Sequence, residues 1–239
     1  MLKHIVKLAV RGLGYDLRRF RPASSNNAQF RAMLQSHGIN LVLDVGANIG
    51  QFGKTLRGLG YQGRIVSFEP LSAEREQLLK SSKNDPLWEV APRAAIGSED
   101  GEINIHKAAN SQSSSALNML NVHVSAAPES RYIGSERVPM RRLDSLAPGY
   151  MRQDSISFLK IDTQGYEDRV LSGAGRTLGR IAGLQLELSL VSLYDGQRLF
   201  DDLMGQVKAS GFELWSISPV LVDPRTGRLL QVDATFFRR

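Results

Sequence analysis

The fold is decided by residues 41–50, which read Leu-Val-Leu-Asp-Val-Gly-Ala-Asn-Ile-Gly. An apolar run ends in the acid Asp44 and is followed by a turn that contains Gly46 and Gly50. A helical pattern then occupies residues 51–59. A buried strand, a glycine turn and a helix are typical of a βαβ unit, in which ligands bind beside the carboxyl end of the strand. We therefore expect a ligand at this turn.

The residues of the turn indicate which ligand it suits. A pyrophosphate-binding loop would carry the pattern G-x-G-x-x-G, whereas residues 46–50 are Gly-Ala-Asn-Ile-Gly and lack one glycine. Asp44 would also repel a pyrophosphate. S-adenosylmethionine suits the acid better, because it carries both a sulfonium and an amino group.

A second apolar run, residues 65–68, ends at Glu69, 25 residues after Asp44. An acid at this place can accept hydrogen bonds from both ribose hydroxyls of a bound nucleoside. That role suits either an adenosine cofactor or NAD, so the first turn has to decide between them.

Short apolar runs alternate with helical patterns along the rest of the chain. The runs are residues 87–90, 157–161, 184–190 and 213–217, and the helical patterns are residues 28–37, 51–59 and 73–81. Such alternation predicts an α/β fold with a mostly parallel sheet that is covered on both faces. Near the end, Asp-Pro-Arg-Thr-Gly at residues 223–227 predicts a hairpin turn between two strands.

Two stretches depart from this alternation. Residues 101–106 alternate with a period of two, which predicts an antiparallel strand. Residues 110–135 are rich in Ser and Asn. Because long unstructured loops in compact domains are usually functional, we predict a mobile substrate loop or lid over residues 108–137. Plain disorder of this stretch is the alternative.

Five segments occur together in an order and spacing that resemble the FkbM family of S-adenosylmethionine-dependent methyltransferases. They are residues 43–52 (LDVGANIGQF), 68–70 (FEP), 95–102 (AIGSEDGE), 142–146 (RLDSL) and 159–167 (LKIDTQGYE). The resemblance implies a Rossmann-like class I methyltransferase fold over residues 23–239. Its seven-stranded, mostly parallel sheet would have helices on both faces and an antiparallel last strand. The family often has Val-Glu-Gly where this chain has Thr163-Gln164-Gly165, which puts a role for an acid at position 164 in doubt.

The resemblance and the turn together predict the residues that contact S-adenosylmethionine. They are Asp44, Gly46, Ala47, Asn48, Gly50, Gln51, Phe52, Glu69, Ala94 and Asp162. For Gln51 and Phe52 the alternative is helix capping and core packing, and for the segment around Ala94 it is an ordinary turn at a strand end.

Methyl transfer to an alcohol needs correctly positioned reactants and removal of the hydroxyl proton. Asp162 and Glu187 end neighbouring apolar runs, and His123 lies in the polar stretch, where it would be a mobile base. We therefore predict these three as the catalytic residues, with a solvated loop His as the alternative for His123. Two carboxylates can also hold Mg²⁺, but nothing else in the sequence supports a metal, and hydrogen bonding of both acids to loop amides is the expectation.

The charge of the chain is uneven. Its net charge is +6, yet residues 1–22 contain six Lys and Arg and one acid, and the chain ends in two Arg, so the remaining residues sum to −1. In residues 1–13, Leu2, Ile5, Val6, Ala9 and Leu13 form one helical face and Lys3, Lys7 and Arg11 another. This basic amphipathic helix predicts either peripheral contact with an anionic membrane surface or packing on the domain. The chain has no Cys, which excludes disulfides, thiolate metal sites and a thiol nucleophile.

We therefore expect a cytoplasmic O-methyltransferase, with possible contact at the inner membrane face. The acceptor would be a hydroxyl of a sugar, a glycolipid or a secondary metabolite. The acceptor molecule could be small or a lipid-linked glycan. Oxygen as the acceptor atom comes from the resemblance alone. Two alternatives stay open: an RNA methyltransferase or RNA-binding protein, which the near-neutral body disfavours, and a non-catalytic cofactor-binding scaffold, which the Gln164 departure allows.

Overall fold

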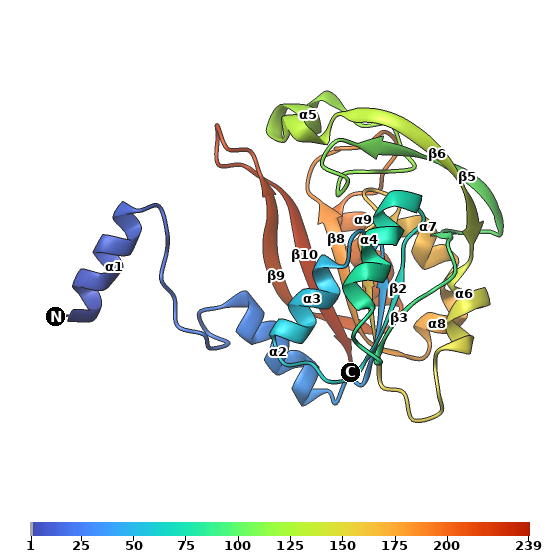
Figure 1. Ribbon diagram of the computed structural model, residues 1–239, viewed down its shortest axis with the longest axis horizontal. Coiled ribbons are helices and arrows are strands. Elements are labelled where there is room, and N and C mark those ends of the chain that lie inside the picture. Colours follow the sequence, from blue (N-terminus) through green and yellow to red (C-terminus); the bar gives the residue numbers. More distant parts are fainter. Residues whose placement is uncertain (1) are drawn as a thin grey trace.

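A seven-stranded sheet forms the centre of the molecule, with the strand order β3-β2-β1-β7-β8-β10-β9 (Figure 1). The computed structural model describes the backbone of residues 2–239 and the side chains of residues 6–8 and 10–239. The strands of this sheet are β1 (Leu41–Val45), β2 (Arg64–Phe68), β3 (Trp88–Val90), β7 (Ser157–Ile161), β8 (Ile181–Ser189), β9 (Phe212–Val222) and β10 (Leu229–Arg238).

Within this sheet, as far as the structure describes the chain, only the last strand, β10, is antiparallel to its neighbours. β1 pairs in parallel with β2 and β7, and β7 pairs in parallel with β8. β10 pairs antiparallel with both β8 and β9, and the turn predicted at residues 223–227 joins β9 to β10. The predicted class I methyltransferase sheet is therefore confirmed.

The helices cover both faces of the sheet. They are α1 (Leu2–Gly12), α2 (Asn26–Ser36), α3 (Gln51–Gly58), α4 (Ser72–Ser82), α5 (Asn121–Ala126), α6 (Leu143–Leu146), α7 (Glu167–Ser172), α8 (Gly175–Leu178) and α9 (Phe200–Ala209), with short 3₁₀ turns at Pro128–Ser130 and Ala147–Gly149. On β1, Leu41 and Leu43 pack in one core with α6 to α9, whereas Val42 packs in the other with α2, α3 and α4. This alternation follows from the two-residue period of a strand, and it explains why buried parallel strands read as continuous apolar runs.

A second, three-stranded sheet lies near the carboxyl ends of the central strands (Figure 1). It consists of β4 (Ala95–Ile96), β5 (Gly101–Ala108) and β6 (Tyr132–Arg141), with β5 and β6 antiparallel. The period-two pattern at residues 101–106 correctly predicted β5. Leu71, Ile105, Val138 and Met140 form a separate small core under this sheet.

The polar stretch between β5 and β6 is more ordered than the sequence suggests. It contains α5 and the turn Pro128–Ser130, and it is joined to the body by bridges from Ser115 to His106 and from Met119 to Tyr194. Its Ser and Asn side chains form local turns, since the Asn110 side-chain oxygen accepts the Ser113 N–H at 3.1 Å. Plain disorder, the alternative for this stretch, therefore does not describe residues 121–126 and 132–137, which form α5 and the start of β6. A mobile substrate loop or lid over residues 108–137 stays a prediction.

The N-terminal helix α1 stands apart from the domain and is connected to it by an extended segment (Figure 1). Val6 and Leu8 on this helix are exposed, so the expected alternative of packing on the domain is not what the structure shows. The side chains of Leu2, Lys3, Ile5 and Ala9, which belong to the predicted amphipathic pattern, lie outside the described part. The division at residue 22 stays a prediction.

Candidate active site

A cavity of about 340 Å³ opens at the carboxyl ends of β1, β2, β7 and β8. Its size falls in the range of small-molecule sites. Nine of the predicted site residues line it: Gly46, Ala47, Asn48, Gln51, Phe52, Glu69, Ala94, Asp162 and Glu187. Further walls come from β5 and from residues 111–116. The structure thus brings together most of the residues that the sequence singled out.

The turn after β1 is shaped by its contact with the end of β7. Gly46 has a φ of 78°, and a Cβ added there would lie 1.8 Å from the backbone oxygen of Asp162. Only glycine tolerates both conditions. Asn48, with a φ of 49°, also adopts the left-handed conformation, and its side-chain oxygen accepts hydrogen bonds from Gln51 and Ser111. The turn is therefore held rigidly against the cavity.

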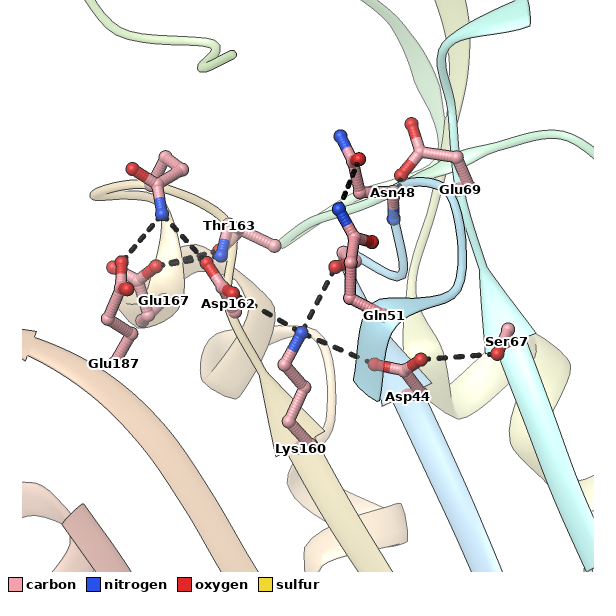
Figure 2. Close-up of polar contacts among 12 residues, drawn as sticks. Asp44, Asn48, Gln51, Ser67, Glu69, Lys160, Asp162, Thr163, Glu167 and Glu187 are labelled. Carbon is pink, nitrogen blue, oxygen red and sulfur yellow. Dashed lines mark hydrogen bonds and ion pairs between the residues drawn. The ribbon is translucent and has the colours of Figure 1, made fainter. Parts of the chain in front are cut away.

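Glu69 lies at the opposite side of this turn, and it is almost fully buried. One carboxylate oxygen accepts the Asn48 N–H at 2.8 Å, beside which it lies in Figure 2. The other accepts the Leu71 N–H at 2.9 Å. Burial raises the pKa of Glu69 to about 7, although these two backbone hydrogen bonds oppose the shift. Each oxygen keeps a second lone pair, so the side chain can still accept two further donors from a ligand.

Asp44 and Gly50 were expected to contact the cofactor, but the structure does not place them on the cavity wall. Asp44 has no exposed surface. Its carboxylate pairs with Lys160, with Oδ1 3.3 Å from Nζ, and accepts a hydrogen bond from Ser67 at 3.2 Å (Figure 2). Gly50 precedes α3 with a φ of 90°, and a Cβ there would press on Leu78 and Trp88 at 3.0 Å. Both residues therefore support the cavity wall through buried contacts and do not line it.

Lys160, which was not among the predicted site residues, connects the β1 turn to the end of β7. Its ammonium lies 3.3 Å from both Asp44 Oδ1 and Asp162 Oδ2 and donates a hydrogen bond to the Gly46 carbonyl at 3.1 Å (Figure 2). Burial works against the charged form, but the charges of Asp162 and Asp44 outweigh it and raise the pKa of Lys160. A Lys inside the apolar strand Ser157–Ile161 was the available signal, because buried charges are paired.

The acids at the ends of β7 and β8 are joined by one amide. The Gln164 Nε2 donates one hydrogen to Asp162 Oδ1 at 2.8 Å and the other to Glu187 Oε2 at 2.6 Å (Figure 2). Its Oε1 accepts a hydrogen bond from the Tyr194 hydroxyl at 2.7 Å, which fixes the orientation of the amide. Burial, then the charges of Asp162 and Asp233, raise the pKa of Glu187 well above its ordinary value. Gln164 therefore replaces an acid by a double donor.

A third acid, Asp233 on β10, also lines the cavity and was not predicted. It lies directly opposite Glu187 in the antiparallel register. Burial and the charge of Asp162 raise the pKa of Asp233 to about 6. No local motif marks this residue, because its approach to Glu187 depends on the pairing of distant strands.

His123 does not belong to the cavity wall. It lies in α5 with 2% of its surface exposed, and its ring meets the Tyr194 ring edge-on with 5.1 Å between centroids. Burial lowers the pKa of His123 to about 4. The expectation of a mobile loop base is therefore wrong, because the polar stretch folds into a helix that buries this side chain.

The remaining acid of the motif has a structural role. Glu167 accepts hydrogen bonds from the Thr163 N–H, the Thr163 hydroxyl and the Gly165 N–H, which holds the turn after β7. Among residues whose side chains the structure describes, no group of three or more His, Cys, Asp or Glu could hold a metal ion.

Comparisons with known proteins agree with this geometry. The family model described as the methyltransferase FkbM domain matches residues 44–214. No curated protein matches the chain in sequence.

Solved structures are similar to the chain at low identity and with TM-scores below 0.5. TehB from Haemophilus influenzae is 9% identical with a TM-score of 0.47, and the match covers 88% of this chain and 62% of TehB, so the chain spans less than two thirds of that protein. Sp1610 from Streptococcus pneumoniae, solved with S-adenosyl-L-methionine, is 12% identical with a TM-score of 0.49, and the match covers 88% of this chain and 72% of Sp1610. Precorrin-6y C5,15-methyltransferase from Geobacter metallireducens is 13% identical with a TM-score of 0.43, and 89% of each chain is covered.

The family match spans more than half of the chain and runs from the β1 turn through the acids of β7 and β8. The chain belongs to the FkbM family of S-adenosylmethionine-dependent methyltransferases.

Proposed function

We propose that this methyltransferase transfers its methyl group to a hydroxyl oxygen of a polyhydroxylated acceptor, such as a sugar. The observation that carries the proposal is the convergence of Asp162, Glu187 and Asp233 from three neighbouring strands on one cavity. Hydroxyl groups need partners that accept hydrogen bonds and a group that takes their proton, and carboxylates supply both.

The residues of the cavity fit the cofactor of the family. Gly46, Ala47 and Asn48 line the cavity, and the methionine end of the cofactor would lie against this turn. The two remaining lone pairs of Glu69 match the two ribose hydroxyls. Apolar side chains for the adenine ring line the cavity next to Glu69: Phe68, Leu71, Ala94, Ala95 and Ile96. When bound, S-adenosylmethionine supplies an activated methyl group.

Polar side chains also line the cavity. They are Ser111, Gln112, Ser114, Ser115 and Gln185. Several adjacent hydroxyls of one ligand suit this wall.

The three acids have different environments, which suggests different roles. Asp162 is paired with Lys160 and orients groups near the transferred methyl. Burial and the charges of Asp162 and Asp233 raise the pKa of Glu187 well above its ordinary value, which favours the protonated carboxyl, and a protonated carboxyl can donate a hydrogen bond to the acceptor. Asp233, with a pKa of about 6, is ionised above that pH and still basic enough to take the hydroxyl proton.

The test uses the full chain with methyl-labelled S-adenosylmethionine and separate panels of methyl glycosides, primary amines and short RNAs. We expect label in methyl ethers of the glycosides. Asp233→Asn and Glu187→Gln should lower kcat/KM at least 100-fold while S-adenosylhomocysteine affinity changes less than threefold. Glu76→Gln, an exposed acid on α4, is the matched control. Transfer to amines or RNA alone, or full activity of Asp233→Asn, would contradict the proposal.

A further inference from the structure

The N-terminal leader, defined here as residues 2–22, exposes an unusual set of side chains. Six large hydrophobic side chains are exposed between residues 6 and 20, with exposed fractions from 42% to 76%: Val6, Leu8, Leu13, Tyr15, Leu17 and Phe20. The rest of the described chain, more than ten times as long, exposes only eleven. Monomeric proteins rarely gather apolar side chains on the surface without a partner.

The same segment is strongly basic. Lys7, Arg11, Arg18, Arg19 and Arg21 are all exposed. The single acid of the segment, Asp16, pairs with Arg18 at 2.7 Å and with Arg11 at 3.4 Å. The leader therefore keeps a net positive charge, in contrast to the near-neutral body of the chain.

We propose that the leader binds the surface of an anionic lipid bilayer. Basic side chains are attracted to anionic headgroups, and apolar and aromatic side chains enter the boundary between headgroups and acyl chains. A polyanion such as RNA would pair with the basic groups but would leave six large hydrophobic side chains in water. A bilayer surface satisfies both the basic and the apolar side chains of the leader.

Two further observations agree with a surface contact. Among residues 2–239, no helix is both long and apolar enough to span a membrane, so contact through the leader would be peripheral. α1 has 11 residues, a length at which an isolated helix is marginal in water. Because Figure 1 shows α1 apart from the domain, a membrane interface would supply the packing that the domain does not.

The test measures binding of the full chain to vesicles by flotation, with phosphatidylcholine alone and with phosphatidylcholine containing 30% phosphatidylglycerol. We expect at least tenfold tighter binding to the anionic vesicles at low salt and loss of this preference at high salt. The helical circular-dichroism signal should increase with the anionic vesicles only.

Two leader variants separate the contribution of the basic side chains to vesicle binding from that of the apolar side chains. Arg18→Gln/Arg19→Gln/Arg21→Gln and Leu13→Ser/Leu17→Ser/Phe20→Ser should each weaken binding at least tenfold. The matched control, Leu79→Ser/Leu87→Ser/Ile133→Ser, removes three exposed apolar side chains from the body and should bind like the unmodified chain. Since all these side chains are exposed, each variant should keep the unmodified thermal unfolding profile.

Equal binding to both vesicle types, no binding to either, or full binding by both leader variants would overturn the proposal. Leader-dependent binding to a short RNA at the same salt concentration, without vesicle binding, would assign the segment to nucleic acid instead. Because none of these measurements involves methyl transfer, the proposal can fail or hold independently of the proposed function.

Discussion

The Lys160 ammonium lies 3.3 Å from Asp44 Oδ1, and this ion pair keeps the motif acid of β1 away from the cavity. Asp44 thus acts on the site indirectly, through a Lys that also holds the Gly46 carbonyl and Asp162. Strands β1 and β7 are neighbours in the sheet, with Asp44 paired to Lys160 in register. In the sequence Asp44 is predicted to bind a ligand, whereas in the structure it is buried behind the residues that line the cavity.

Removing the Lys160 ammonium should therefore lower the free energy of unfolding. Lys160→Met leaves the fully buried Asp44 carboxylate without its counter-ion, which should destabilise the fold by about 3–5 kcal/mol in urea unfolding. The double variant Asp44→Asn/Lys160→Met should recover part of that loss, because no buried charge remains at β1. Lys54→Met, on the exposed side of α3, serves as the control. A double variant as unstable as the sum of its single variants would contradict the pairing.

The Gln164 amide donates hydrogen bonds to both Asp162 and Glu187. Gln164→Glu would put a third carboxyl group in its place. The new carboxyl oxygens would lie within hydrogen-bond distance of Asp162 and Glu187, so the folded protein must bind an additional proton. Because the pKa of the new carboxyl is raised on folding, stability falls as pH rises above about 4.5. We expect Gln164→Glu to lose on the order of 2–3 kcal/mol at pH 8 and less at pH 5.

The matched control for this experiment is Gln112→Glu, which makes the same charge change at an exposed position on the cavity rim. Its unfolding free energy should change little at either pH. If Gln164→Glu and Gln112→Glu showed the same pH dependence, the amide would not be the link between the two acids.

Much of the fold followed from local patterns, because alternation and glycine turns are local properties. The apolar runs at residues 41–43 and 65–68 became β1 and β2, and the turn at residues 223–227 joins β9 to β10. The cavity wall formed by Gly46, Asn48 and Glu69 could be foreseen for the same reason, since Gly46 and Asn48 belong to the turn after β1 and Glu69 directly follows β2.

The parts of the site that the sequence did not predict depend on contacts between distant segments. Asp233 meets Glu187 only because β10 runs antiparallel beside β8 in one particular register, and sequence periodicity does not specify which strands become neighbours. His123 was misassigned because a Ser- and Asn-rich composition indicates turns. It does not show that those turns fold a short helix against the buried Tyr194.

The buried His123 should make stability sensitive to acid. Its folded-state pKa of about 4 lies below the ordinary 6.5, so its contribution is fully present above pH 6.5 and is lost as pH falls toward 4. His123→Phe keeps an aromatic ring beside Tyr194 but cannot take up a proton. Between pH 7.5 and pH 5, unfolding free energy should fall by about 1–2 kcal/mol more in the unmodified chain than in His123→Phe. Val122→Phe, at the neighbouring exposed position of α5, should follow the unmodified chain, and equal pH dependence of all three proteins would contradict a buried neutral imidazole.

Two glycine substitutions with opposite expected signs test the geometry of the β1 turn. Gly46→Ala would place a Cβ 1.8 Å from the Asp162 backbone oxygen at a φ of 78°, so it should destabilise the fold by at least about 3 kcal/mol. Gly205, inside α9, has no atom within 4 Å of an added Cβ, so Gly205→Ala should stabilise by about 0.5–1 kcal/mol. Urea unfolding of both variants at pH 7.5 measures the difference. A Gly46→Ala protein as stable as the unmodified chain would mean that the β1 turn and the end of β7 do not approach each other as closely as described, and the cavity wall would have to be reassigned.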